Sequence, residues 1–176
     1  MIDSIKNLRK QIAARVLNVS KNPGYYTWWL DEEGMRQILS PLKGIDYSRI
    51  MKKLIGGKDY YALYFGISSN LKNRIKWHIS QHHTQSSVKS GYLSTLRKTI
   101  SALVGIDMTK SEQAVNKFMD DHCWLEFDNC ASYVVAKQME KNTLQDGYYP
   151  LNIQGNKGVD CKIGAQISGL RKEFKK

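Results

Sequence analysis

Five short groups of residues carry side chains that could together hydrolyse a phosphodiester bond. Such a reaction needs an oriented water, a group that takes its proton, positive charge at the phosphate oxygens, and a stabilised leaving oxygen. The groups supply tyrosines, an arginine, a histidine, a glutamate and an asparagine. In chain order they are Gly24-Tyr25-Tyr26, Tyr64-Phe65-Gly66, Arg74 with His78, Glu140, and Pro150-Leu151-Asn152.

The hydrophobic pattern predicts that most of these groups lie on strands or helices. Aromatic, β-favouring runs predict strands over residues 25–30 and 60–67, which pair antiparallel, and a third strand over 124–127. Apolar residues at three- and four-residue steps predict helices. Their ranges are 5–16, 71–80, 93–103, 111–119, 131–144 and 164–174.

Residues 35–55 are interpreted as short helical pieces, with Ile50 and Leu54 as a buried pair. The predicted fold class is therefore α+β: a small three-stranded, mainly antiparallel sheet flanked by helices, with helical insertions and an extra N-terminal helix. The length favours a single domain over residues 1–176.

The ordered set of groups resembles the GIY-YIG nuclease family. Residues 24–26 stand where that family has Gly-Ile-Tyr, and residues 64–66 stand where it has Tyr-Ile-Gly, so Tyr25 and Phe65 replace the isoleucines. The later matches are its arginine, a histidine one turn on, its metal-binding glutamate and its closing asparagine: Arg74, His78, Glu140 and Asn152. The resemblance places a nuclease core at 23–152, with insertions at 31–59 and 80–123.

The resemblance implies a metal-dependent DNA endonuclease and a role for each matched residue. Arg74 would clamp the scissile phosphate, and Glu140 would hold one Mg²⁺ or Mn²⁺. Tyr26 would take a proton from the water or orient it, aided by Tyr64. His78 would bond a tyrosine or the phosphate, or share the role of base. A free tyrosine has a pKa of about 10, so nearby cations must lower it. The structural supports would be Gly24, Gly66 and Asn152.

The distribution of charge also favours a nucleic-acid partner. The net charge is +11, and no Asp or Glu occurs from Tyr60 to Ile106. Phosphate contacts dominate nucleic-acid affinity, so this one-signed segment suits a polyanion, although a solvated basic face would look the same. The predicted contacts are Lys72, Lys76, His82, His83, Arg97, Lys98 and Lys157.

Targeting signals and cysteine pairs are missing from the sequence. No run of 18 apolar residues suits a membrane span, and the charged N-terminus lacks a signal core, so we expect a cytoplasmic protein without a membrane partner. The three cysteines read as reduced thiols. Since one active site cuts one strand, we expect a monomer or a transient homodimer.

Other interpretations compete with the enzyme. Tyr26 and Tyr64 could be ordinary strand aromatics, and Trp28, Trp29 and Trp77 are read as packing residues rather than base-stacking ones. Histidines 78, 82 and 83 could form a metal cluster, but no cysteine or carboxylate lies near them in the sequence. A non-catalytic nucleic-acid-binding module is the alternative function, and RNA is an alternative substrate.

Overall fold

A five-stranded sheet forms the centre of the protein in the computed structural model, which describes residues 1–175. The strands are β1 (Ile2–Ser4), β2 (Gly24–Asp31), β3 (Lys52–Ile55), β4 (Lys58–Ser68) and β5 (Cys123–Asn129). The helices are α1 (Ile5–Ala13), α2 (Glu32–Leu39), the 3-10 helix η1 (Tyr47–Arg49), α3 (Leu71–Ser80), α4 (Gln85–Lys89), α5 (Thr95–Leu103), α6 (Glu112–His122), α7 (Tyr133–Asp146) and α8 (Cys161–Glu173). Among the described residues, no helix is long and apolar enough to cross a membrane.

The sheet has the order β1-β5-β2-β4-β3, and every neighbouring pair is antiparallel. The α+β class is confirmed, but the prediction of three strands is wrong. The three central strands are the predicted ones, and β1 and β3 extend the two edges. The central position of β2 sets Tyr26 opposite Gly66 on β4 and opposite Phe127 on β5.

Strand β3 lies in the segment that was predicted to be helical. Gly56 and Gly57 both have positive φ angles, of 55° and 81°, and form a two-residue turn between β3 and β4. Such a turn is the usual connection of a tight hairpin, so it imposes a strand on the residues before it. The predicted pair is also wrong: Ile50 is 5% exposed, whereas Leu54 lies on the edge strand and is 69% exposed.

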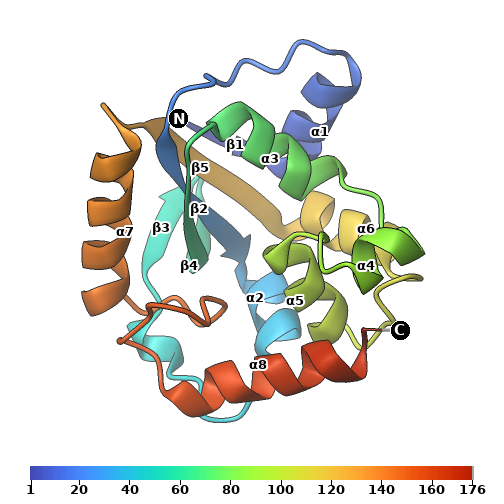
Figure 1. Cartoon of the computed structure of the whole chain (residues 1–176). Coiled ribbons are helices and arrows are strands. Elements are labelled where there is room, and N and C mark those ends of the chain that lie inside the picture. Colours follow the sequence, from blue (N-terminus) through green and yellow to red (C-terminus); the bar gives the residue numbers. More distant parts are fainter. Residues whose placement is uncertain (176) are drawn as a thin grey trace.

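The sheet carries packed residues on both faces. The larger cluster contains Trp28 and Leu125 of the sheet with residues of α1, α3, α5, α6 and α8. The smaller cluster contains Trp29 and Phe65 with Leu144 of α7. Figure 1 shows α7 apart from the other helices, across the sheet from α5 and α6. Residues on opposite faces of the sheet can therefore contact each other only near the ends of the strands, or through residues of the sheet itself.

Two capped helices carry the residues predicted to act on phosphate and metal. Asn70 caps α3 by accepting from the backbone N–H of Asn73, and Leu71, Ile75 and Ile79 form its buried stripe. Ser132 caps α7 in the same way. Helix α3 has the predicted bounds, and α7 begins and ends two residues later than predicted. Arg74 and Glu140 are thereby held by separate helices.

Candidate active site

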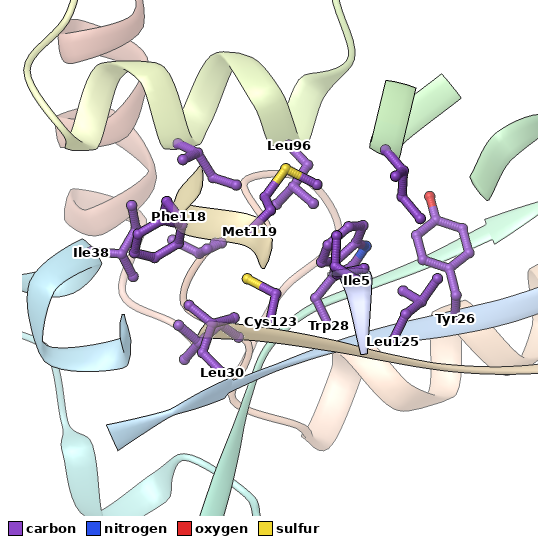
Figure 2. Packing of buried hydrophobic residues seen from close by; sticks show 14 of the residues in the cluster. Ile5, Tyr26, Trp28, Leu30, Ile38, Leu96, Phe118, Met119, Cys123 and Leu125 are labelled. Carbon is purple, nitrogen blue, oxygen red and sulfur yellow. The ribbon is translucent and has the colours of Figure 1, made fainter. Parts of the chain in front are cut away.

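Tyr26 and His78 form a buried hydrogen-bonded pair. The hydroxyl of Tyr26 lies 2.9 Å from Nε2 of His78, and Nδ1 of His78 lies 3.1 Å from Oγ of Ser94. Tyr26 and His78 are each 2% exposed. Figure 2 shows the Tyr26 ring at one end of the core cluster with its hydroxyl directed away from the sheet. Of the two partners predicted for His78, the structure has the tyrosine.

The environment of this pair keeps both side chains uncharged. Burial, and then Arg74 and Arg97, lower the pKa of His78 from 6.5 to about 3. Burial raises the pKa of Tyr26 well above 10, the nearby Tyr64 raises it further, and Arg74 lowers it. His78 is therefore a neutral imidazole near neutral pH, and Nε2 can accept the hydrogen of the Tyr26 hydroxyl.

The two glycines of the tyrosine groups are required by close packing. A Cβ atom at Gly66 would lie 2.6 Å from the hydroxyl oxygen of Tyr26. A Cβ atom at Gly24 would lie 2.2 Å from the backbone oxygen of Asp128 and 2.4 Å from Leu71. Both positions therefore exclude a side chain.

Tyr64, Glu140 and Arg171 line one cavity of about 360 Å³, together with Asn152 and residues of the 153–154 loop. Tyr64 is half-buried, and its ring centroid lies 6.4 Å from that of Tyr26. Burial raises the pKa of Tyr64, whereas Arg74 and Arg171 lower it. Tyr26 does not line this cavity. The tyrosine that faces the open space is therefore Tyr64, and Tyr26 lies behind it.

Arg74 is close to the same groups. Its guanidinium carbon lies 4.7 Å from the centroid of the Trp77 ring, and its positive charge lowers the pKa values of Tyr26, Tyr64 and Glu140. No residue among 1–175 accepts a side-chain hydrogen bond from it. The cation–π contact with Trp77 leaves the donors of the guanidinium free, which suits a phosphate.

The carboxylate of Glu140 is similarly free. Glu140 is half-buried, burial raises its pKa, and Arg74 lowers it. Within the described residues it forms no hydrogen bond or ion pair, and no group of three His, Cys, Asp or Glu side chains could hold a metal. One free carboxylate fits Mg²⁺, which keeps several waters and takes the rest of its ligands from substrate phosphates.

The side chain of Asn152 hydrogen-bonds the loop after α7 to strand β4. Its Oδ1 accepts from the Phe65 N–H at 2.8 Å, and its Nδ2 donates to the Phe65 carbonyl at 2.7 Å. One side chain thus satisfies both backbone groups of the residue that follows Tyr64. Through these two bonds Asn152 holds the loop in place against strand β4.

The predicted nucleic-acid contacts divide by exposure. Lys76 and Lys157 are exposed, and Lys72 is half-buried. Lys157 lines a second hollow with Glu140, Lys137 and Lys141, so three lysines surround the approach to the glutamate. His82 is exposed but hydrogen-bonds Glu112 at 2.9 Å, and Lys98 donates to the Gly91 carbonyl at 2.5 Å.

Arg97 and His83 lie in the interior, so the prediction that they contact nucleic acid is corrected. Arg97 is 0% exposed and donates to the carbonyls of His78 and Ile79, to Asn116, and to Nε2 of His83. His83 is 4% exposed. Arg97 lies four residues after Leu93 and three before Ile100, which puts it on the buried face of α5. It stabilises the C-terminal end of α3 by bonding carbonyls that have no partner within the helix.

Arg171 is the cavity residue that the sequence analysis missed. It donates through Nε to Thr99 Oγ1 at 3.1 Å and through an Nη to the Thr95 carbonyl at 3.2 Å. Burial lowers its pKa to about 10. No motif marks this position, but Ile163, Ile167 and Arg171 recur every four residues. That spacing places the arginine on the buried side of α8.

A family model described as GIY-YIG catalytic domain matches residues 24–173. The match contains all five groups of residues and runs to the end of α8, so it includes Arg171. It confirms the resemblance seen in the sequence. No curated protein and no solved structure gives a significant match.

Proposed function

We propose, on the premise that this chain belongs to the GIY-YIG catalytic domain family, that it is a metal-dependent endonuclease that hydrolyses DNA phosphodiester bonds. The observation that carries the proposal is the meeting of Tyr64, Glu140 and Arg171 in one cavity within the field of the unpaired Arg74. Two guanidinium groups, a free carboxylate and a phenol are together suited to a phosphodiester and the water that attacks it.

The two arginines would contact the non-bridging oxygens of the scissile phosphate. Arg74 has free donors, and its guanidinium carbon lies 4.7 Å from the centroid of the Trp77 ring. Arg171 is fixed by Thr95 and Thr99, so its guanidinium would be in place before the substrate arrives. Donors fixed in advance need little reorganisation when charge develops on the phosphate. Glu140 would hold a Mg²⁺ or Mn²⁺ ion, which would offset phosphate charge and acidify bound water.

The tyrosines would manage the attacking water. Tyr64 faces the cavity, so its hydroxyl would contact the water, and Tyr26 would position Tyr64 from behind. Neutral His78 would accept the Tyr26 hydrogen, in the tautomer protonated at Nδ1, and so fix the direction of that hydroxyl. Cationic groups lower the pKa of Tyr64, as Arg74 and Arg171 do in the free protein.

One observation favours a non-catalytic nucleic-acid-binding module instead. Burial raises the pKa values of both Tyr26 and Tyr64, so neither phenol is a ready base in the free protein. Such a module would use the same arginines and the lysines at 137, 141 and 157 to bind the phosphate backbone without cutting it.

Nicking of supercoiled plasmid with Mg²⁺, Mn²⁺ or EDTA separates the two functions. We expect the wild type to nick only with metal, Glu140→Gln to bind DNA without nicking, and Glu33→Gln, which changes an exposed carboxylate on α2, to behave as wild type. Nicking by Glu140→Gln at the wild-type rate would exclude Glu140 as the metal ligand. Salt-sensitive binding without nicking by any variant, on the plasmid and on a DNA that carries an unpaired nucleotide, would favour the binding module. A labelled RNA strand tests the alternative substrate.

A further inference from the structure

An open hollow of about 580 Å³ shares Arg74 with the active site. Two aromatic rings, Trp77 and Tyr92, line it together with Arg74 and the polar side chains of residues 68–70 and 73. Trp77 follows Arg74 on α3, whereas Tyr92 comes from the loop between α4 and α5. Apart from Arg74, the proposed reaction uses none of the residues that line this hollow.

The ring of Tyr92 is exposed, yet its position is fixed. Tyr92 is 67% exposed, and its centroid lies 5.7 Å from that of Trp77. Gln81 Nε2 donates to the Tyr92 carbonyl at 3.0 Å, and the next residue, Leu93, donates its N–H to the Ser87 carbonyl at 3.0 Å. A large ring that the core does not bury, on a backbone anchored on both sides, is available for an outside partner.

The chemistry around the rings suits a nucleotide. All residues of the hollow lie between positions 60 and 106, the stretch without Asp or Glu, so the hollow carries no carboxylate that would repel phosphate. Asn73 and the Nδ2 group of Asn70 offer amide groups of the kind that bond the edges of bases, whereas the Ser68 hydroxyl bonds the Asn70 backbone and Asn70 Oδ1 caps α3. Trp77 is also occupied on one side by the Arg74 guanidinium, which leaves Tyr92 as the freer stacking surface.

We propose that the hollow binds an unpaired base of the DNA strand beside the scissile phosphate, stacked against Tyr92. Inside a duplex both faces of a base are covered by its neighbours, so a protein ring can engage only a base that has left the stack. The proposal rests on the proposed function. It makes the preferred substrate a DNA with a single-stranded or unpaired nucleotide next to the cut, rather than an unbroken duplex.

Binding of two matched DNAs in EDTA tests the proposal without cleavage. One duplex carries a single unpaired 2-aminopurine, and the other is the same sequence fully paired. We expect the wild-type protein to bind the unpaired form at least about fivefold more tightly, since stacking on one ring stabilises by about 1 kcal/mol or more, and to quench the 2-aminopurine fluorescence. Tyr92→Ala should lose both effects, and Tyr92→Phe should keep both.

The control variant is Tyr47→Ala, which removes a 43% exposed ring from η1 and should keep the preference and the quenching. Thermal unfolding checks that all variants are folded. If Tyr92→Ala prefers and quenches the unpaired base as the wild type does, the hollow is not a base site. If the wild type nicks plasmid but shows no preference, this inference fails while the nuclease stands. If it neither nicks nor binds DNA, both fail.

Discussion

The hydroxyl of Tyr26 and Nε2 of His78, separated by 2.9 Å, join the central strand β2 to helix α3. Ser94, at the start of α5, extends the connection on the other side of the imidazole. The strand that carries the first tyrosine group and the helix that carries Arg74 therefore share one buried polar contact. A change in the charge of His78 acts on the fold and on the site together.

Acid should destabilise the protein through its buried histidines. The pKa values of His78 and His83 are lowered from 6.5 to about 3 and about 4, chiefly by burial. The unfolded chain therefore binds protons more readily than the folded one, and the free energy of unfolding falls as the pH drops below about 6.5. Each histidine contributes up to about 1.4 kcal/mol per pH unit, until the pH reaches its folded pKa.

Urea unfolding between about pH 7 and about pH 5 measures this slope. His83→Gln should have a shallower slope than wild type, because one of the two titrating groups is gone. His82→Gln is the matched control, since that side chain is 78% exposed, and its slope should stay near that of the wild type. An unchanged slope in His83→Gln would contradict the assignment.

A methyl group at Gly66 should damage the site. Gly66→Ala would place Cβ 2.6 Å from the Tyr26 hydroxyl, so Tyr26 must move and its bond to His78 must lengthen. We expect a loss of about 1–3 kcal/mol in the free energy of unfolding and slower nicking. Gly169→Ala, on the exposed face of α8 with nothing within 4 Å, should instead stabilise by about 0.5–1 kcal/mol. Equal stabilities of the two variants would refute the packing argument.

Substitutions of Arg97 and Lys76 should distinguish a cation that stabilises the fold from a cation that binds DNA. Arg97→Met leaves the carbonyl of His78 and the side chain of Asn116 without their donor, so we expect a loss of about 3 kcal/mol or more. Lys76→Met, at an exposed position of α3, should change stability by less than about 0.5 kcal/mol. Lys76→Met should also reduce, by about one, the slope of log K for DNA binding against the logarithm of the salt concentration. If instead Arg97→Met were stable and had the reduced salt slope, Arg97 would be a DNA contact after all.

Arg171 should matter for cleavage more than for DNA affinity. Arg171→Gln keeps polar contacts toward Thr99 but removes the charge beside Tyr64, so nicking should slow at least about tenfold. Arg36→Gln, which breaks an exposed i,i+4 ion pair with Glu32, is the control and should nick as wild type. Single-turnover rates at saturating enzyme distinguish this effect from weaker binding. A wild-type rate in Arg171→Gln would remove it from the site.

Elements whose side-chain patterns determine structure locally could be predicted from the sequence. The aromatic, β-favouring runs predict the central strands, and the stripe of Leu71, Ile75 and Ile79 predicts helix α3, because both patterns are visible without tertiary information. Strand β1 could not be recognised from three residues, because only pairing with β5 makes it a strand. Strand β3 could have been predicted from the adjacent glycines Gly56 and Gly57, because a two-residue turn joins two paired strands.

Side-chain placement was harder to predict than the elements. The basic segment was treated as one surface, but Arg97 lies on the buried face of its own helix and Lys76 does not. Arg171 is far from the other cavity residues in the sequence, and only the packing of α8 against α5 brings it to Tyr64. Trp77 was read as packing, and the structure adds Arg74 and Tyr92 to its contacts.

Helix α7 lies across the sheet from α5 and α6, and it carries Glu140, whereas Arg74 is carried by α3 (Figure 1). A phosphate bound by Arg74 and by a metal on Glu140 would therefore link helices α3 and α7, which pack against different parts of the protein. Ligand occupancy adds to stability by mass action, so backbone amides of α7 should exchange more slowly when DNA and metal are bound.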